Sequence, residues 1–184
     1  MTKKEKYIDL LKQSGRIGIE NLIKYLEDTD FFIAPASTKF HNSFEGGLLE
    51  HSLNVYENLV KENKLLKKKY DNPSLIIVAL LHDICKANFY EVTTRNVKKN
   101  DKWVKEPYYI VNDQMPLGHG EKSVIIAKSF IALTLEEALA IRWHMGAFEP
   151  SENYNTISTA YNQSKLALLL HIADLKATYI DEVK

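Results

Sequence analysis

The longest apolar segment of the chain, residues 75–81, constrains the fold more than any other feature. It reads Leu-Ile-Ile-Val-Ala-Leu-Leu, so a helix built from it is apolar on every side and must be buried among other elements. Asn72 and Pro73 come just before it, and proline suits the first turn of a helix. The segment is far shorter than the roughly 20 residues that span a bilayer. The sequence therefore predicts a central buried helix ending at His82 and Asp83, and no membrane span.

Helical spacing of apolar residues recurs on both sides of this segment, which predicts a mostly α-helical fold. Thr134 and Glu137 have the spacing of a capping box, so a helix should begin there. Residues 89–111 differ, because β-branched and aromatic residues flank a polar connection at 98–101, and they predict a β-hairpin inserted between helices. The other expected helices cover residues 3–13, 19–28, 47–60, 119–131 and 164–179, with an ordered loop at 31–44.

Composition narrows the class of protein. The 184 residues carry 24 lysines and arginines against 24 acidic residues, so the formal net charge is zero. Proteins that bind duplex nucleic acid usually have a basic surplus, so the sequence has no strong nucleic-acid signature. The single cysteine, Cys85, excludes an internal disulfide and favours a reducing compartment. The N-terminal residues lack the apolar core of a signal peptide. We therefore expect one cytoplasmic domain without membrane association.

Polar residues on otherwise apolar helical segments mark the candidate site. An imidazole and a carboxylate side by side at the end of a buried helix, as in His82 and Asp83, are costly unless they have partners. A bound cation would satisfy both. His51 and Asp174 lie on two other apolar segments and can complete the ligand set. Two imidazole nitrogens and two carboxylates suit Mn²⁺, Fe²⁺, Ni²⁺ or Zn²⁺, and Mg²⁺ is a further candidate.

The order of these residues along the chain resembles a known family. Residues 46–53 (GGLLEHSL), 80–86 (LLHDICK) and 173–174 (AD), with His119 and His144 between the last two, are similar to the HD superfamily of metal-dependent phosphohydrolases. In that family the segment that matches residues 80–86 is usually written LLHDIGK.

Within the superfamily, the segment from His41 to His51 resembles the HD domain of bacterial 3′→5′ exoribonucleases. The chain departs from that subgroup in three ways. Cys85 stands where glycine is usual, and His144 stands where two consecutive histidines are expected. The nucleic-acid-binding domain that precedes the HD domain in those enzymes is missing from this sequence.

The resemblance implies an HD-type helical bundle that hydrolyses a phosphomonoester or phosphodiester bond in a small, nucleotide-like phosphorylated substrate. The HD core would cover residues 41–181, after an N-terminal helical extension over residues 1–40, in a single domain of residues 1–184. Two alternatives remain. One is a 3′→5′ exonuclease on short RNA or DNA, which the zero net charge disfavours. The other is a regulatory module that binds metal or nucleotide without catalysis. The oligomeric state stays open.

The same resemblance implies catalytic roles for Asp83, Lys86, His119 and His144. A metal held by Asp83 and its partners lowers the pKa of bound water from about 15.7 toward 7. Lys86, four residues after His82, would share its helix face and approach the substrate phosphate, as the matching lysine does in the family. His119 and His144 either bind a second metal bridged by Asp83, or contact the phosphate and protonate the leaving oxygen, or are structural. The chain would bind one or two ions.

The hairpin at residues 89–111 is locally basic and rich in aromatic residues. Such cations and rings can hold a nucleobase and a phosphate. An ordinary solvated hairpin with one packed face accounts for the same residues, and we favour that interpretation. If the hairpin has a function, it sets the choice of substrate rather than the chemistry. The residues concerned are Arg95, Lys98, Lys99, Lys102 and Lys105 with Tyr90, Trp103, Tyr108 and Tyr109.

Overall fold

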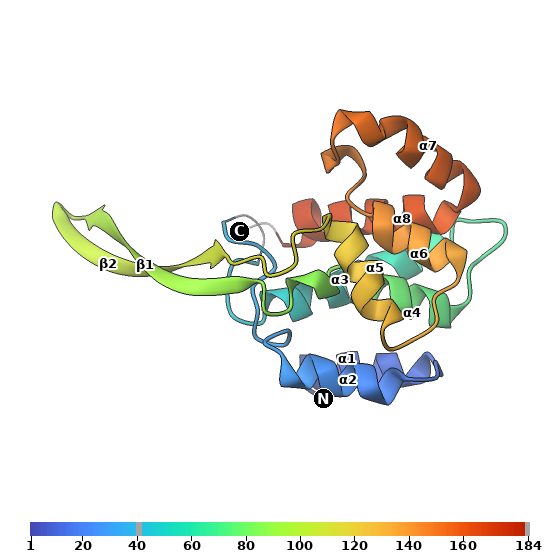
Figure 1. Ribbon diagram of the computed structural model, residues 1–184, viewed down its shortest axis with the longest axis horizontal. Helices are drawn as coiled ribbons and strands as arrows, with labels where there is room; N and C mark the ends of the chain where they lie inside the picture. Colours follow the sequence, from blue (N-terminus) through green and yellow to red (C-terminus); the bar gives the residue numbers. More distant parts are fainter. Residues whose placement is uncertain (40–41, 183–184) are drawn as a thin grey trace.

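The computed structural model describes residues 1–39 and 42–182, and His41 lies outside them. Helices form the body of the molecule, and a two-stranded sheet extends from it (Figure 1). This arrangement confirms the prediction of a mostly α-helical bundle with one inserted hairpin. The helices are α1 (Lys3–Gln13), α2 (Ile19–Asp28), α3 (Gly47–Asn63), α4 (Asn72–Leu81), α5 (His119–Lys128), α6 (Leu135–Trp143), α7 (Tyr154–Gln163) and α8 (Lys165–Lys176), and the strands are β1 (Tyr90–Lys99) and β2 (Lys102–Val111).

Helix α4 is the centre of the bundle, as its apolar sequence predicts. Every side chain from Leu75 to Leu81 is buried, and α4 packs against α1, α3 and α6. Its residues divide between two hydrophobic clusters, one shared with α1, α2 and α3 and the other with α3, α6 and α8. Asp71 caps its first turn through a hydrogen bond from the Ser74 amide (3.0 Å), with Pro73 in that turn. Among the helices that the structure describes, none has the length and apolar character needed to cross a bilayer.

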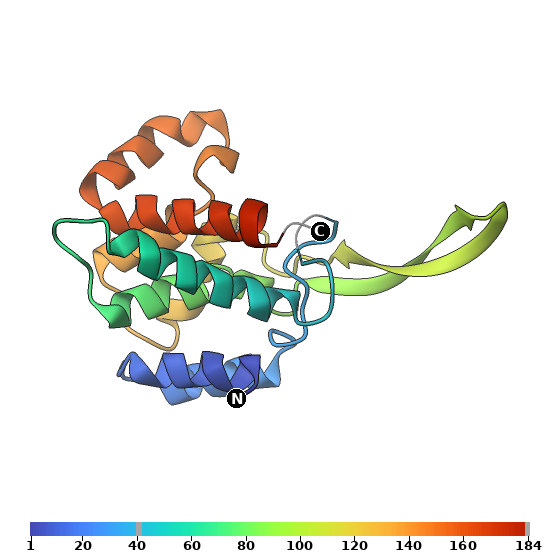
Figure 2. The same ribbon diagram turned by 180° about the vertical axis from the view of Figure 1, so that it is seen from behind.

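The N-terminal helices α1 and α2 pack on the side of the bundle formed by α3 and α4 (Figure 2). Tyr7 of α1 is fully buried, and its hydroxyl donates a hydrogen bond to the carbonyl of Leu80 in α4 (2.6 Å). Phe31, just after α2, packs against the Tyr7 ring, with ring centroids 5.3 Å apart. The N-terminal segment therefore shares its hydrophobic core with α4, the helix that His82 and Asp83 follow.

Strands β1 and β2 pair in antiparallel register from Tyr90 opposite Val111 to Lys99 opposite Lys102. The connection is only Asn100 and Asp101, and both have left-handed backbone conformations (φ 48° and 60°). Two such residues match the twist of a tight hairpin turn. The hairpin is confirmed, but the strands are longer than predicted, because residues 98 and 99 belong to β1 rather than to the connection. The ribbon projects away from the helices (Figures 1 and 2).

The remaining differences from the predicted helices lie at their ends. Thr134 and Glu137 form the expected capping box at α6. Helix α5 ends at Lys128, three residues earlier than expected, and α8 ends at Lys176. After α8 the chain makes a π-helical turn, Ala177–Asp181, and short 3₁₀ turns occur at Ile84–Lys86, Gly146–Phe148 and Ser151–Asn153. Helix α7 was not predicted, because its sequence is rich in Asn, Ser and Thr and it buries only Ile157 and Ala160.

Candidate metal centre

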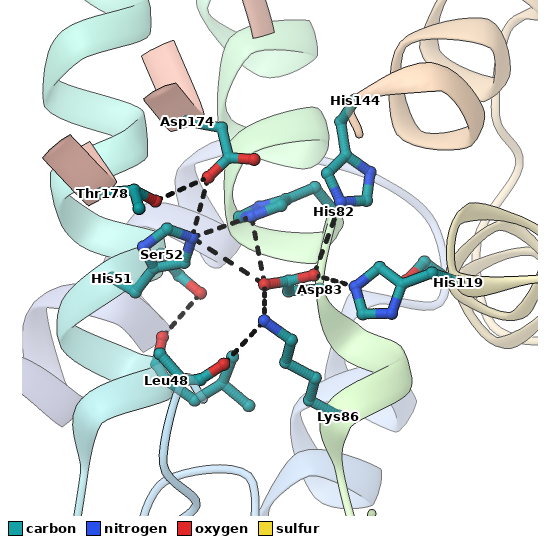
Figure 3. A network of polar contacts seen from close by, with 12 residues as sticks. Leu48, His51, Ser52, His82, Asp83, Lys86, His119, His144, Asp174 and Thr178 are labelled. Atoms are coloured by element: carbon teal, nitrogen blue, oxygen red, sulfur yellow. Dashed lines mark hydrogen bonds and ion pairs between the residues drawn. The ribbon is translucent and has the colours of Figure 1, made fainter. Parts of the chain in front are cut away.

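Six polar side chains from five helical elements meet at one end of the bundle (Figure 3). Helix α3 supplies one of them, and two come from the residues that follow α4. The others come from the first residue of α5, the residue after α6 and the last turns of α8. We call this group the central cluster, and its members are His51, His82, Asp83, His119, His144 and Asp174.

Asp83 is the centre of the cluster, because its two oxygens face different partners. Oδ2 lies 3.8 Å from His51 Nε2 and 3.5 Å from His82 Nε2. Oδ1 accepts a hydrogen bond from His119 Nε2 (2.6 Å) and lies 3.5 Å from His144 Nε2. The carboxylate is buried, so these contacts occur away from bulk water. A single carboxylate therefore joins two groups of imidazoles.

His51 and His82 link the two aspartates among the four residues predicted as metal ligands. His51 Nε2 lies 3.2 Å from Asp174 Oδ1 and 3.3 Å from His82 Nε2. Ligand atoms of His51, His82 and Asp174 all lie within 4.8 Å of one another, and so do those of His82, Asp83 and His144. The structure thus brings together every histidine and aspartate that the sequence nominated.

Backbone contacts fix the orientation of two of the rings. His82 donates from Nδ1 to the Ala79 carbonyl (2.8 Å), and His144 donates from Nδ1 to the Ile141 carbonyl (2.7 Å). Because Nδ1 carries the proton in both rings, Nε2 presents its lone pair to the cluster. His144 Nε2 is buried and makes no hydrogen bond within the described part of the chain. A buried nitrogen of this kind is what a cation would satisfy.

Glu182 is the site residue that the sequence analysis missed. His51 donates from Nδ1 to the two Glu182 carboxylate oxygens (3.1 and 3.2 Å), and Asn54 donates to the same carboxylate (2.9 Å). The π-helical turn after α8 brings this carboxylate back toward α3. Nothing in the sequence around Glu182 separates it from an ordinary charged helix end, so only the turn geometry reveals its contact with His51.

The electrostatics of the cluster favour the metal-binding forms of Asp83, Asp174 and His82, whereas His51 must release a proton before it can bind a cation. Burial disfavours the charged form of Asp83, but Lys86 and the neighbouring histidines outweigh it and hold the Asp83 pKa well below its usual range. Burial likewise opposes ionisation of Asp174, yet His51 lowers its pKa. Burial lowers the pKa of His82 to about 4, so its imidazole is neutral near pH 7. Hydrogen bonds to Asp174 and Glu182 overcome burial and raise the pKa of His51 to about 9.

These donors fit a divalent transition metal. The cluster offers imidazole nitrogens and ionised carboxylates, which suit borderline cations. Cys85 Sγ lies 3.5 Å from His119 Nδ1 and belongs to a third potential ligand group with Asp83 and His119. Burial raises the pKa of Cys85 to about 12, so this side chain remains a thiol and behaves as a packed residue. The metal-binding character of the cluster therefore comes from its histidines and aspartates.

Lys86 is held beside the cluster by a 3₁₀ turn rather than by the α-helix that was predicted. We expected it on the helix face of His82, but α4 ends at Leu81 and the chain then forms the 3₁₀ turn Ile84–Lys86. The turn directs Lys86 Nζ to Asp83 Oδ2 (2.6 Å) and to the Ala36 carbonyl (2.7 Å). The lysine is buried beside the cluster. Its ammonium group is therefore a fixed positive charge next to Asp83.

A cavity of about 700 Å³ opens above the cluster. Asp83, Lys86, His119 and other polar residues line its floor, and its walls carry aromatic and aliphatic side chains. A concave site with apolar walls and a few convergent polar groups is typical of small-molecule binding. The apolar and aromatic wall residues include Tyr90, Val111, Met145, Phe148, Leu175 and Tyr179.

The contact of Glu182 with His51 leads to a prediction. Glu182→Gln should weaken metal binding about tenfold, because the carboxylate that orients the His51 ring and raises its basicity is replaced by a neutral amide. Isothermal titration of the metal-free protein with Mn²⁺ measures the affinity. Asp181→Asn is the matched control, since it removes the same charge one residue earlier from a side chain that contacts Asn58 instead (2.6 Å). Equal losses in both variants would contradict a specific role for Glu182.

Comparison with known proteins places the chain in a family. A protein of Methanocaldococcus jannaschii named as a dihydroneopterin 2′,3′-cyclic phosphate phosphodiesterase is 39% identical to the chain over 61 residues. The match covers 31% of this chain and 24% of that protein, so the chain spans about a quarter of its relative's length. A search of the solved structures found no significant match. The model of the HD domain family matches residues 48–178, which is more than half of the sequence and contains the whole central cluster. The chain therefore belongs to the HD domain family.

Proposed function

We propose that this protein is a metal-dependent phosphohydrolase that cleaves a phosphomonoester or phosphodiester bond in a nucleotide-like substrate. The observation that carries the proposal is the position of Asp83. Its oxygens face two groups of imidazoles, Lys86 lies 2.6 Å away, and all of them are next to a cavity of about 700 Å³. A fixed cation beside a metal site can stabilise the charge that develops on a phosphoryl group.

In this proposal His51, His82, Asp83 and Asp174 hold one divalent ion, which is Mn²⁺, Fe²⁺, Ni²⁺, Zn²⁺ or Mg²⁺. His119 and His144 would hold a second ion together with Asp83, or would contact the substrate phosphate directly. The contacts of His119 and His144 with the same Asp83 oxygen support a shared role for these two residues. A bound ion of this kind polarises a phosphoryl oxygen and makes hydroxide available near neutral pH.

The chain's own side chains would bind and orient the substrate. The Lys86 ammonium offsets negative charge on the phosphate. The side chain of His119 keeps 26% of its surface exposed and lines the cavity, so it can contact the leaving oxygen of a bound substrate. Tyr90, Phe148 and Tyr179 offer aromatic surface in the cavity walls, where a planar base can stack.

The name of the Methanocaldococcus jannaschii relative, a cyclic phosphate phosphodiesterase, supports phosphodiester chemistry. A second candidate function is 3′→5′ exonuclease activity on short RNA or DNA, and the composition of the hairpin favours it. A regulatory module that binds metal or nucleotide without turnover would use the same cluster. We also propose that residues 1–184 form one domain, with residues 1–40 as an extension on the 41–181 core, which the hydrophobic cluster shared by α1, α3 and α4 supports.

A metal and substrate screen tests the proposed function. The metal content of the purified protein is measured first. The protein is then assayed with Mn²⁺, Fe²⁺, Ni²⁺, Zn²⁺ or Mg²⁺ against mononucleotides, cyclic nucleotides, dinucleotides and short oligonucleotides. Turnover of the small substrates is the expected result, and shortening of oligomers would support the exonuclease. Bound metal or nucleotide with no turnover of any of these substrates would overturn the hydrolase in favour of the regulatory module.

A further inference from the structure

The hairpin is an arm that starts and ends at the cavity. We use "the arm" for β1, β2 and the turn between them, residues 90–111. Its first and last residues, Tyr90 and Val111, are paired in the sheet and both line the cavity. The rest of the arm extends away from the helices (Figures 1 and 2). An isolated two-stranded ribbon is only marginally stable in water. Stability of the fold therefore does not explain the length of the arm, and we infer that the arm has a function.

The register divides the arm into two faces, because successive side chains of a strand point to opposite sides of a sheet. Tyr90 and Val111 are opposite each other, so they define one face, which we call the cavity-side face. It consists of the even-numbered residues of β1 from 90 to 98 and the odd-numbered residues of β2 from 103 to 111. The other residues of the two strands form the opposite face.

The two faces differ in charge. The cavity-side face carries Lys98 and Lys105 and, in the arm as the structure describes it, no carboxylate. The opposite face has Glu91 and Glu106 among its cations. The strand residues of the cavity-side face thus carry only positive charges, and one of them, Lys98, pairs with the turn residue Asp101 (2.7 Å).

Aromatic and aliphatic side chains lie between the cavity-side lysines. Trp103 is 71% exposed near the tip, and Val92 is 65% exposed nearer the cavity. Tyr109 follows, in edge contact with Tyr90 at the cavity wall (ring centroids 6.4 Å apart). Trp103 and Val92 are therefore exposed on this face, whereas Tyr109 is half-buried at its cavity end.

We propose that the cavity-side face of the arm binds single-stranded nucleic acid and leads one end of the strand to the cavity. Bases stack on exposed aromatic rings whatever their sequence, and lysines pair with the phosphates between them. A duplex offers no free base faces, and its binding depends on more phosphate contacts than two lysines supply. Strand binding by the arm stands independently of the hydrolase, whereas delivery of the strand end to the cavity rests on the proposed function.

Binding is measured by fluorescence anisotropy of a labelled oligonucleotide of about twelve nucleotides, in RNA and DNA form, with the full chain and excess chelator. Lys98→Ala/Lys105→Ala should weaken binding about tenfold or more and reduce the slope of log affinity against log salt by about 1.4. Lys99→Ala/Lys102→Ala is the matched control on the opposite face. Each double substitution removes two positive charges and one ion pair. The lost ion pair is Lys98 with Asp101 in the test variant and Lys99 with Glu106 in the control. The control should bind within about twofold of the unmodified protein.

A second measurement tests the stacking part of the proposal. Trp103→Ala should weaken oligonucleotide binding about tenfold, since base stacking on one aromatic side chain has about this effect. In the unmodified protein, the oligonucleotide should quench the fluorescence of the exposed Trp103 and not that of Trp143, which is 9% exposed. Quenching should disappear in the Trp103→Ala variant.

Several outcomes would overturn the proposal. Equal weakening by both lysine pairs would indicate general attraction of a polyanion. Equal competition by poly-glutamate would indicate an acidic protein partner, and no binding at micromolar protein would exclude a nucleic acid surface.

Turnover of mononucleotides should be unchanged in the Lys98→Ala/Lys105→Ala variant, because these residues lie outside the central cluster. Oligonucleotide binding without any turnover would refute the hydrolase and leave the arm proposal intact.

Discussion

Replacement of Asp83 by asparagine is expected to lower kcat/KM at least about 10³-fold. The carboxylate of Asp83 contacts both groups of imidazoles, through Oδ2 toward His51 and His82 and through Oδ1 toward His119. Asparagine has nearly the same volume, but it removes the negative charge and replaces one oxygen by an NH2 group, whose nitrogen cannot bind a cation. Steady-state kinetics with the best substrate of the screen measures the loss.

Asp113→Asn provides the control for this variant. Asp113 also pairs with a buried lysine, since its Oδ2 accepts from Lys122 Nζ at 2.7 Å, but it lies outside the cavity. This substitution should leave kcat/KM within about threefold of the unmodified protein, because a paired carboxylate away from the reacting groups affects stability more than chemistry. Full activity of Asp83→Asn, with circular dichroism and metal content unchanged, would remove the basis of the proposed mechanism.

Lys86→Ala should lower kcat about 10²-fold while the protein keeps its metal. Burial opposes the charge of Lys86, but Asp83 outweighs it and raises the lysine pKa above its usual range, so the ammonium form persists in the site. An ammonium group has no lone pair to give to a cation, so its removal takes charge stabilisation from the phosphate and no ligand from the metal. Metal analysis and kinetics on the same preparation separate the two effects.

Chemical rescue sharpens this second test. The truncated side chain leaves space beside Asp83 and the Ala36 carbonyl, the two groups that accept from Lys86 Nζ. Ethylammonium should enter that space and restore part of kcat, and a neutral alcohol of the same size should not. Loss of metal from Lys86→Ala would contradict the role assigned to this lysine, because the defect would then lie in the ligand set.

The sequence was sufficient to predict the architecture and most of the cluster. The all-apolar residues 75–81 predict a buried central helix, and a buried helix that ends in His82 and Asp83 requires partners for both. His51 and Asp174 were identifiable because each interrupts an apolar segment. Polar residues in otherwise apolar helical segments thus indicate a buried polar site, and apolar periodicity is enough to find them. The structure brings these four residues together.

The contacts that escaped prediction depend on departures from regular helix geometry. Glu182 reaches His51 because a π-helical turn follows α8. Lys86 contacts Asp83 three residues earlier in the chain, across a 3₁₀ turn that replaces the α-helix predicted there. A rule based on 3.6 residues per turn misplaces Glu182, whereas it also brings Lys86 near Asp83. The length of the strands depended on the turn, since Asn100 and Asp101 accept left-handed conformations and so let the pairing continue to residue 99.

The alternation of side chains along the arm limits how its length can vary. One residue inserted into each strand next to Tyr90 and Val111 would preserve the pairing but rotate Trp103 and both lysines of the cavity-side face to the reverse side of the ribbon. Two residues inserted into each strand would restore them and only lengthen the reach. Homologues that use the arm in the same way should therefore differ in strand length by even numbers of residues per strand.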